Sequence, residues 1–291
     1  MNTSQVVLIT GSNSGFGRLT VETLSKAGYQ VYASMRQLHT KNAEAAKNLQ
    51  AWAEAEKVSV KLVEIDVTDE ASVQSGVSQV LADAGRIDVL VNNAGFGVAG
   101  VQEAFTLAQT QSVFEVNVFG VLRMCRAVLP AMRAQRSGLV VHISSGLGRM
   151  VLPFVGPYAA SKFALEALGE AMRYELQPFG VDSVIVEPGA YPTTEFGGKI
   201  LMPEDQATLQ SYGAVAEIPG KMFAKMAENA RHNPPNPQSV AEIIKNLIET
   251  PFGQRPLRTV SGNDVKAVEI INEASRQVQE NVLAYFMPKA L

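Results

Sequence analysis

The stretch Val6-Val-Leu-Ile-Thr10-Gly11-Ser-Asn-Ser-Gly15-Phe-Gly17 lies close to the start of the chain and decides its fold. The apolar run predicts a buried strand, and the glycines after it predict a tight turn that opens a helix. Such a turn lets backbone N–H groups approach a pyrophosphate at the positive end of a helix. The spacing is G-x-x-x-G-x-G rather than G-x-G-x-x-G, so alone it also fits a plain strand-to-helix turn. Its position at the head of a strand–helix array favours dinucleotide binding.

Downstream of this turn, short β-branched runs alternate with longer helical patterns. Runs such as Val89-Leu-Val and Val184-Ile-Val are apolar on both faces, which is typical of parallel strands covered by helices on each side. The sequence therefore predicts an α/β fold, a doubly wound, mostly parallel seven-stranded sheet of Rossmann type with helices on both faces. Strands are expected at residues 6–10, 29–35, 58–66, 87–92, 138–144, 181–187 and 257–261, and helices near 15–27, 41–56, 70–84, 109–135 and 157–177.

Two segments depart from this alternation, yet we expect residues 1–291 to form a single domain. Residues from about 190 to 236 show no clear strand and are interpreted as a substrate-loop insertion. Residues from about 263 to 291 are helical by pattern and are interpreted as a C-terminal extension. Between the two, Ser239 and Glu242 have capping-box spacing, which predicts the start of a helix.

Composition narrows the class of protein. Hydrophobic residues make up 46% and charged residues 18%, which excludes a disordered chain. The net charge is −3 with both signs mixed, so we expect no nucleic-acid partner. Three scattered histidines lack metal-ligand spacing, and the single cysteine, Cys125, predicts no internal disulfide, so we expect no metal. No charged-then-apolar leader and no apolar run of about 18 residues is present. The expectation is a cytoplasmic protein with no membrane partner.

Tyr158 and Lys162 carry the first sign of chemistry, because a four-residue spacing places them on one helix face. A phenol has an ordinary pKa of about 10, and a nearby ammonium group stabilises its phenolate. Ser145, thirteen residues before Tyr158, is able to hydrogen-bond the same substrate oxygen, although Ser144 serves equally by position alone. A Tyr-x-x-x-Lys pair by itself is common on solvated helices. Here the predicted strands end at Asn92-Asn93-Ala94-Gly95 and at Ser144-Ser145, the sheet edge where open α/β sheets bind ligands.

The end of the second predicted strand bears on cofactor choice. An NAD-preferring site places an acid about 20 residues beyond the glycine motif, where it binds the ribose 2′-OH. This chain has no acid there and reads Val31-Tyr-Ala-Ser-Met35-Arg36. A guanidinium group suits a 2′-phosphate, so Arg36 favours NADP, with NAD possible. The alternative is that Arg36 is an ordinary solvated loop residue.

Together these motifs strongly resemble the short-chain dehydrogenase/reductase family, in order and spacing, over nearly the whole chain. The resemblance is closest to its short, single-domain branch, among members resembling steroid, retinol and carbonyl reductases. It implies that Tyr158 is the general acid–base and that Ser145 orients the substrate oxygen. It implies that Lys162 lowers the tyrosine pKa and binds the nicotinamide ribose. Asn117 matches the fourth catalytic position, which holds a water in a proton relay to the lysine.

The resemblance also implies a set of dinucleotide contacts, with Asp66 at the adenine and residues 188–193 at the carboxamide. Asp66 and Thr193 also fit ordinary turn or capping positions. The expected contacts are Gly11, Ser12, Ser14, Gly15, Phe16, Gly17, Arg36, Asp66, Val67, Asn93, Ala94, Gly95, Tyr158, Lys162, Pro188, Gly189 and Thr193.

The function expected from these residues is NADP(H)-dependent interconversion of a carbonyl and a primary or secondary alcohol, an oxidoreductase acting on CH–OH groups. Met150, Leu152 and Phe154, with the loop 190–226, enclose an apolar substrate or else simply fill the core. The alternatives are an NAD-dependent alcohol or diol dehydrogenase and a non-catalytic dinucleotide-binding regulator. Helices 109–135 and 157–177 are broadly apolar, and the family pairs them between subunits, so a homodimer or homotetramer is expected.

Overall fold

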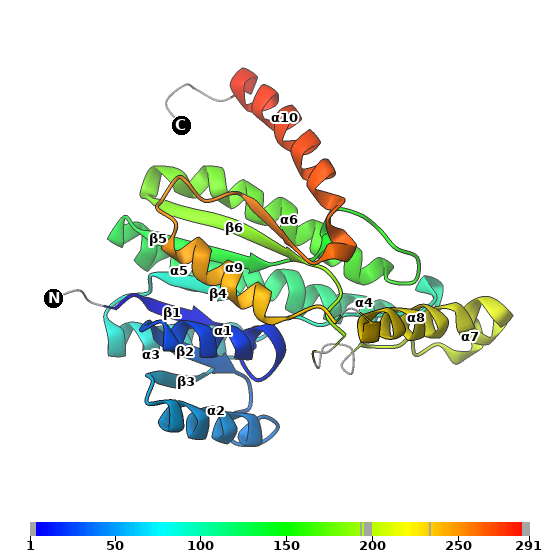
Figure 1. Ribbon diagram of the computed structural model, residues 1–291, viewed down its shortest axis with the longest axis horizontal. Coiled ribbons are helices and arrows are strands. Elements are labelled where there is room, and N and C mark those ends of the chain that lie inside the picture. The colour runs from blue at the N-terminus through cyan, green and yellow to red at the C-terminus, as the bar shows by residue number, and fades with distance from the viewer. Residues whose placement is uncertain (1–3, 193, 195–199, 233, 287–291) are drawn as a thin grey trace.

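One parallel sheet runs through the protein. A computed structural model describes residues 4–192, 194, 200–232 and 234–286. The strands follow the order β3-β2-β1-β4-β5-β6-β7, and each neighbouring pair is parallel (Figure 1). The seven strands are β1 (Val6–Ile9), β2 (Gln30–Met35), β3 (Val60–Glu64), β4 (Val89–Asn92), β5 (Gly138–Ile143), β6 (Val181–Pro188) and β7 (Arg258–Ser261). The predicted doubly wound sheet is confirmed.

Helices cover both faces of the sheet, as the doubly apolar strands require. One face carries α1 (Gly15–Lys26), α2 (Ala43–Glu56) and α9 (Gln238–Glu249), and the other carries α3 (Glu70–Ala84), α5 (Gly120–Gln135) and α6 (Gly156–Leu176). Alternate residues of one strand enter opposite cores, because side chains of a strand point to alternate faces.

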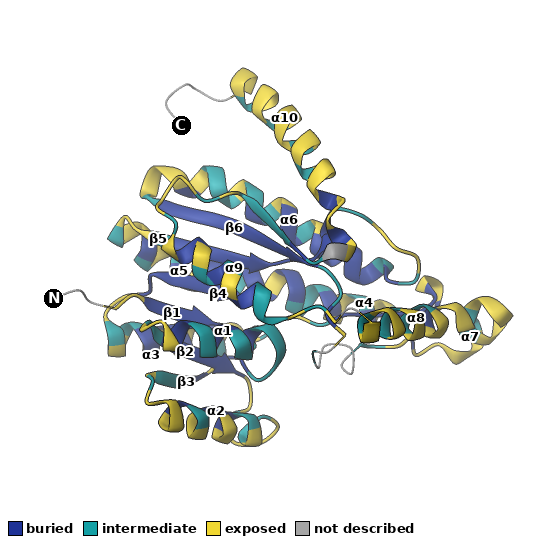
Figure 2. Cartoon of the chain, in the orientation of Figure 1, coloured by how far each residue is buried: buried dark blue, intermediate teal, exposed yellow. Residues whose placement is uncertain are grey.

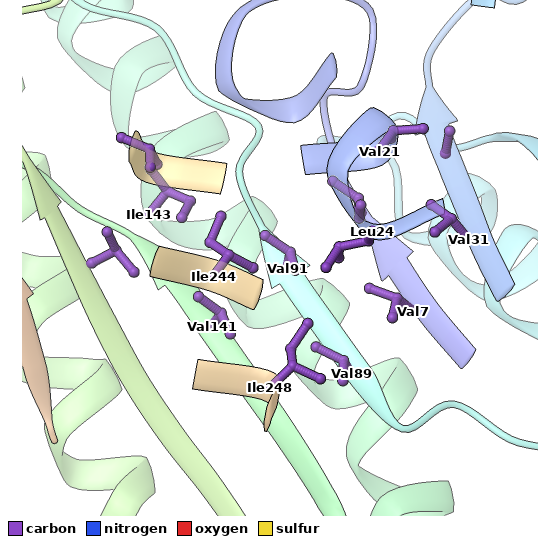
Figure 3. Packing of buried hydrophobic residues seen from close by; sticks show 14 of the residues in the cluster. Val7, Val21, Leu24, Val31, Val89, Val91, Val141, Ile143, Ile244 and Ile248 are labelled. Atoms are coloured by element: carbon purple, nitrogen blue, oxygen red, sulfur yellow. The ribbon is translucent and has the colours of Figure 1, made fainter. Parts of the chain in front are cut away.

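In β1, Val7 belongs to the first core and Leu8 to the second. Figure 3 shows Ile244 and Ile248 of α9 over Val89 and Val141 in the first core.

The expected helix 109–135 is interrupted, which corrects the prediction. It consists of α4 (Leu107–Phe114), a π-helical turn (Glu115–Phe119) and α5. Asn117 lies in the π turn, and its fully buried amide accepts from the backbone N–H of Phe96 at 3.1 Å and donates to its carbonyl at 3.0 Å. A buried amide needs such partners, and π turns often occur at functional sites. The partner lies 21 residues away, so helical periodicity alone does not reveal the interruption.

The start of α9 also differs from the prediction. The helix begins at Gln238, directly after Pro237, so Ser239 lies inside it rather than capping it. The Ser239 hydroxyl donates to the Asn236 carbonyl at 2.8 Å. The predicted capping box is therefore wrong. The N-cap is Pro237, so the proline-fixed turn sets the boundary two residues earlier.

The two irregular segments are largely helical. Within the described part of 190–236 lie α7 (Gln206–Ser211), a 3₁₀ turn (Gly213–Glu217) and α8 (Ile218–His232). The C-terminal segment contains α10 (Val268–Phe286), which projects from the sheet and is exposed over most of its length (Figure 2). Of the described helices, none is long and apolar enough to cross a membrane. Short 3₁₀ turns complete the chain at Gln102–Ala104, Gly146–Gly148, Gln177–Phe179 and Asn263–Val265.

Candidate active site

The carboxyl ends of the strands gather the predicted site residues at one edge of the sheet. The strand order reverses between β1 and β4, which are hydrogen-bonded neighbours. The glycine turn follows β1, Asn93 to Gly95 follow β4, and Ser145 follows β5. Open α/β sheets bind ligands at such a switch point, so topology alone brings these distant segments together.

The glycine turn is folded so tightly that side chains are excluded at two of its positions. Gly11 has φ +68°, and a Cβ there would lie 2.9 Å from the Cα of Ala94. A Cβ on Gly17 would lie 2.3 Å from the Gly11 carbonyl oxygen. Ser14, in extended conformation, forms the N-cap of α1, and buried Ser12 donates its hydroxyl to the Ile9 carbonyl at 3.0 Å. A bare backbone cradle at a helix N-terminus fits a dinucleotide pyrophosphate.

Asn93 and Thr10 brace this cradle. The Asn93 amide donates to the carbonyls of Thr10 at 2.9 Å and Gly11 at 3.0 Å. The Thr10 hydroxyl accepts from the backbone N–H groups of Asn93 and Ala94, each at 3.0 Å. The side chain of Asn93 thus holds the turn instead of projecting into the cleft. Sequence reasoning assigns Thr10 no role, although its place directly before Gly11 is a usable signal.

Arg36 and Asp66 meet at the ends of β2 and β3. Arg36 is half-exposed, and its guanidinium lies 3.8 Å from the Asp66 carboxylate. Burial disfavours ionisation of Asp66, but hydrogen bonds from the backbone and hydroxyl of Thr68, with the Arg36 charge, hold its pKa below the ordinary value. The carboxylate is therefore ionised at neutral pH. Val67 follows it and is buried against Gly120, where a Cβ would lie 2.8 Å from a Val67 methyl.

Tyr158 and Lys162 lie on α6, and both are buried. The Lys162 ammonium donates to the Ile143 carbonyl at 2.8 Å and lies 5.7 Å from the centre of the Tyr158 ring. Burial raises the pKa of Tyr158 to about 12, and a hydrogen bond with Ser145 opposes that rise. Burial lowers the pKa of Lys162 to about 8, and the charge of Glu166 opposes that fall. In the protein alone, burial outweighs the hydrogen bond with Ser145 and sets the direction of the Tyr158 pKa.

The two neighbouring serines point to different places. Ser145 accepts a hydrogen bond from the backbone N–H of Leu147 at 3.1 Å and is a hydrogen-bond partner of Tyr158. Ser144 instead faces Glu166. Both side chains lie close to Gly148, where a Cβ would lie 2.8 Å from the Ser144 hydroxyl oxygen. Geometry therefore places Ser145, and not Ser144, beside the phenol.

Asn117 is linked to the helix of the Tyr–Lys pair. Its amide donates to the Ser161 hydroxyl at 3.0 Å, and Ser161 donates to the Tyr158 carbonyl at 2.7 Å. A Cβ on Gly95 would lie 3.0 Å from the Asn117 carbonyl oxygen and 3.7 Å from the Lys162 nitrogen. The side chain of Asn117 is thus occupied by protein partners. Sequence reasoning misses Ser161 because nothing local marks its contact with Asn117.

The end of β6 completes the cradle. Gly189 follows Pro188, and a Cβ on Gly189 would lie 2.1 Å from one carboxylate oxygen of Asp264. The other carboxylate oxygen of Asp264 accepts a hydrogen bond from the Ala190 backbone N–H at 2.8 Å. Phe16 of the glycine turn packs edge-on against Tyr191, with ring centres 5.2 Å apart. The predicted contact Thr193 lies outside the described residues. Asp264, from beyond β7, is a further site-edge residue that the sequence does not indicate.

No group of three or more histidine, cysteine or acidic side chains within the described ranges is placed to hold a metal ion.

The chain is similar to known proteins in both sequence and fold. The family model described as short chain dehydrogenase matches residues 5–202. Retinol dehydrogenase 8 of Homo sapiens is 38% identical over 84% of this chain and 78% of its own. The 3-ketodihydrosphingosine reductase of Bacteroides thetaiotaomicron is 40% identical over 65% of each chain.

Solved structures extend the match to the whole fold. The crystal structure of a short-chain dehydrogenase from Streptomyces avermitilis is 34% identical, with a TM-score of 0.78, and the match covers 98% of this chain and 97% of that one. A variant of actinorhodin polyketide ketoreductase, solved with NADPH, is 25% identical, with a TM-score of 0.74, over 90% of this chain and 98% of that one. With its seven-stranded parallel sheet and glycine turn, the chain belongs to the short-chain dehydrogenase/reductase family of oxidoreductases that act on CH–OH groups.

Proposed function

We propose that this protein is an NADP(H)-dependent oxidoreductase that interconverts an apolar carbonyl compound and its primary or secondary alcohol, with Tyr158 as the acid–base. The observation that carries the proposal is the buried Tyr158–Lys162 pair, with Ser145 hydrogen-bonded to the phenol, at the sheet edge that holds the glycine turn. The proposed catalytic set consists of Asn117, Ser145, Tyr158 and Lys162.

The chemistry divides between cofactor and chain. The bound nicotinamide would supply or accept the hydride. Ser145 would orient the substrate oxygen, and Tyr158 would donate a proton to it in reduction or accept one in oxidation. The raised pKa keeps the phenol protonated at neutral pH, which suits a proton donor. Lys162 would stabilise the phenolate that results, since a cation one turn away favours the charged form.

Asn117 would support catalysis indirectly, by holding neighbouring segments of the backbone in place. Its side chain fixes the loop after β4 and the first turn of α6 to the π turn. Both N–H donors of the amide are already used, by the Phe96 carbonyl and the Ser161 hydroxyl, so a water bound there would contact the amide oxygen or the backbone of the π turn. The proposed proton relay therefore depends on Asn117 for the shape of the backbone beside Lys162.

The preference for NADP rests on Arg36. Its half-exposed guanidinium lies at the end of β2, at the position where an NAD-preferring site carries an acid. The ionised Asp66 at 3.8 Å holds the guanidinium toward the proposed adenine side. A 2′-phosphate there would gain a charge-assisted hydrogen bond.

Exchanging Arg36→Asp is expected to shift the ratio of kcat/KM for NADPH and NADH toward NADH by about a hundredfold, because a guanidinium–phosphate contact is replaced by charge repulsion. Initial rates with each cofactor at several concentrations measure the ratio. Lys41→Asp, a like change of charge at a nearby exposed position, is the control. An unchanged ratio in Arg36→Asp contradicts the assignment.

The apolar character of the substrate is supported by the surroundings of Tyr158. The phenol belongs to a cluster of apolar side chains from several separate segments, which leaves few polar partners for a charged or sugar-like substrate. Retinol dehydrogenase 8 and 3-ketodihydrosphingosine reductase, the relatives described above, have names that refer to largely apolar molecules. The cluster consists of Val98, Phe105, Val113 and Tyr158, with Phe96, Leu147 and Leu201 packed against it.

The experiment that tests the function measures oxidation of NADPH and NADH across ketones, aldehydes, quinones and steroids. We expect turnover of apolar carbonyl compounds with NADPH. Preference for NADH with alcohols or diols would instead support an NAD-dependent dehydrogenase. Binding of the dinucleotide without turnover of any compound would support a regulator.

A homodimer or homotetramer is proposed on the basis of exposed aromatic side chains on α6 and on the 3₁₀ turn that follows it. Phe163 is 40% exposed and Phe179 is 37% exposed. A groove of about 470 Å³ on this face is lined by Leu129, Pro130 and Leu176 among others. Static light scattering at micromolar concentration is expected to give at least twice the monomer mass, and a monomer alone contradicts this. The proposed location is the cytoplasm.

A further inference from the structure

The segment around Leu201 is hydrogen-bonded to the segment after β4 through backbone groups. Val98 and Leu201 form a parallel β-bridge. The backbone N–H of Ala99 donates to the Leu201 carbonyl at 3.0 Å, and that of Leu201 donates to the Gly97 carbonyl at 2.9 Å. These bonds place Leu201 against the apolar cluster that contains Tyr158.

Gln109 of α4 secures the chain directly after Leu201. Its side chain is 5% exposed, and its amide nitrogen donates to the Met202 carbonyl at 2.8 Å. Its amide oxygen accepts from the backbone N–H of Glu204 at 3.1 Å. A glutamine offers both a donor and an acceptor, so one side chain satisfies two backbone groups of the segment.

The same oxygen of Gln109 accepts from the Thr106 N–H, in the capping box that starts α4. The position of the amide is thus fixed by the helix that carries it. Between its two partners, Pro203 fills the space over Gly100, where a Cβ would lie 2.5 Å from the proline ring. The segment is therefore held by close packing and by the two hydrogen bonds of Gln109 to Met202 and Glu204, which together are called the clamp.

We propose that Gln109 is a positioning residue for substrate recognition, which holds Leu201 as part of the apolar wall beside Tyr158. The inference rests on the proposed function, because the wall is assigned to the substrate of that reaction. Gln109 acts through the backbone of Met202 and Glu204, which lie on either side of Pro203, one and three residues beyond Leu201.

Loss of the clamp leaves other attachments in place. The backbone N–H of Asp205 donates to the Ala104 carbonyl at 3.1 Å, and the Tyr212 hydroxyl donates to Glu103 at 2.6 Å. A variant without the Gln109 amide therefore keeps the outer end of the segment attached. We expect it to fold and to lose mainly the placement of Leu201.

The first test compares Gln109→Met, which keeps the length of the side chain and removes its hydrogen bonds, with Gln111→Met on the exposed side of the same helix. With 2-decalone as a bulky ketone, KM is expected to rise about tenfold in Gln109→Met, the scale of the two hydrogen bonds lost to Met202 and Glu204. The third lost bond, from the Thr106 N–H, lies within the capping box of α4. With cyclopentanone as a small ketone, KM and kcat are expected to stay at parental values. Equal KM values for 2-decalone in the parent and in Gln109→Met overturn the proposal.

The second test needs no turnover. Hydrogen exchange at the amides of Leu201 and Glu204 is expected to accelerate at least about tenfold in Gln109→Met, since protection follows the stability of the local structure. Gln111→Met is expected to retain parental exchange. Leu201→Ala, which keeps the backbone bridge, is expected to raise KM for 2-decalone while leaving exchange of these amides unchanged.

The two tests separate failure of the inference from failure of the proposed function. If the parent reduces no ketone, the function fails, while faster exchange in Gln109→Met still supports the clamp. If exchange in Gln109→Met equals that of the parent, the clamp is refuted, whatever substrate the protein reduces.

Discussion

Tyr158→Phe is expected to lower kcat by about a thousandfold, because the substitution removes the proton-donating hydroxyl and keeps the aromatic ring. The phenol is buried, and a hydrogen bond joins it to Ser145. No other hydroxyl is expected to replace it, since Ser145 is far too weak an acid to protonate an alkoxide efficiently. Cofactor binding is expected to remain largely intact, because the cradle around Gly11 and Asn93 makes no use of the phenol.

The measurement is single-turnover reduction of a ketone with NADPH, combined with titration of NADPH by fluorescence. Tyr174→Phe is the matched control, because Tyr174 lies on the same helix and its hydroxyl hydrogen-bonds Glu170. Turnover by Tyr158→Phe at near-parental rate would refute the role of Tyr158. Loss of NADPH binding along with turnover would show a structural effect instead.

The sheet was predictable because each strand has a local signature. Val89 to Val91 and Val184 to Val186 are buried on both faces, and that burial imposes continuous apolar runs that any parallel strand of this kind must carry. The ends of strands and the glycine turn follow from the same local rules. The convergence of Gly11, Asn93 and Ser145 at one edge then follows from topology without any knowledge of side-chain contacts.

The parts that were not predictable depend on distant partners. Asn117 lies in a π turn where Phe96 supplies two of its hydrogen bonds and Ser161 a third, and no periodic signal in residues 109–135 records those contacts. Similarly, Gln109 looks like a surface residue of an amphipathic helix until Met202 and Glu204 are seen to approach it from 93 and 95 residues away. Such long-range polar pairs leave no pattern in the sequence near either partner.

The electrostatic state of the site was the least accessible to the sequence. The spacing of Tyr158 and Lys162 predicts a lowered phenol pKa, whereas burial raises the pKa of Tyr158 to about 12 and lowers that of Lys162 to about 8. Desolvation disfavours both charged forms, and its size depends on all neighbouring segments. The spacing of the pair shows in the sequence, whereas its burial does not.

A second buried cluster shows the same dependence on tertiary structure. Arg258 of β7 pairs with Glu166 at 2.8 Å and with Glu170 at 2.6 Å, while Glu187 of β6 lies 3.6 Å away. Asn272 of α10 donates to the Glu187 carboxylate at 2.6 Å. Three carboxyl groups thus share one guanidinium. Burial raises the pKa of Glu187 to about 8, and repulsion from Glu166 adds to that rise.

The free energy of unfolding is therefore expected to fall as pH rises. The ordinary pKa of Glu187 is 4.5, so in the unfolded chain it releases its proton near that pH, while the folded protein retains the proton up to about 8. Stability from the protonated carboxyl is full below pH 4.5 and is lost as pH rises through about 8. We expect a loss of about 2 kcal/mol between pH 5.5 and 8.5, within the limit of 1.36 kcal/mol per pKa unit.

Glu187→Gln tests this cause, because an amide keeps an oxygen for Asn272 and carries no titrating proton. Urea unfolding at pH 5.5, 7.0 and 8.5 is expected to show that the variant gains stability relative to the parent as pH increases. Glu175→Gln, on the exposed face of α6, is the control and is expected to track the parent at every pH. If Glu187→Gln also tracks the parent, the proton lies on another group of the cluster. Glu166 is then the next carboxyl to exchange, since burial raises its pKa as well.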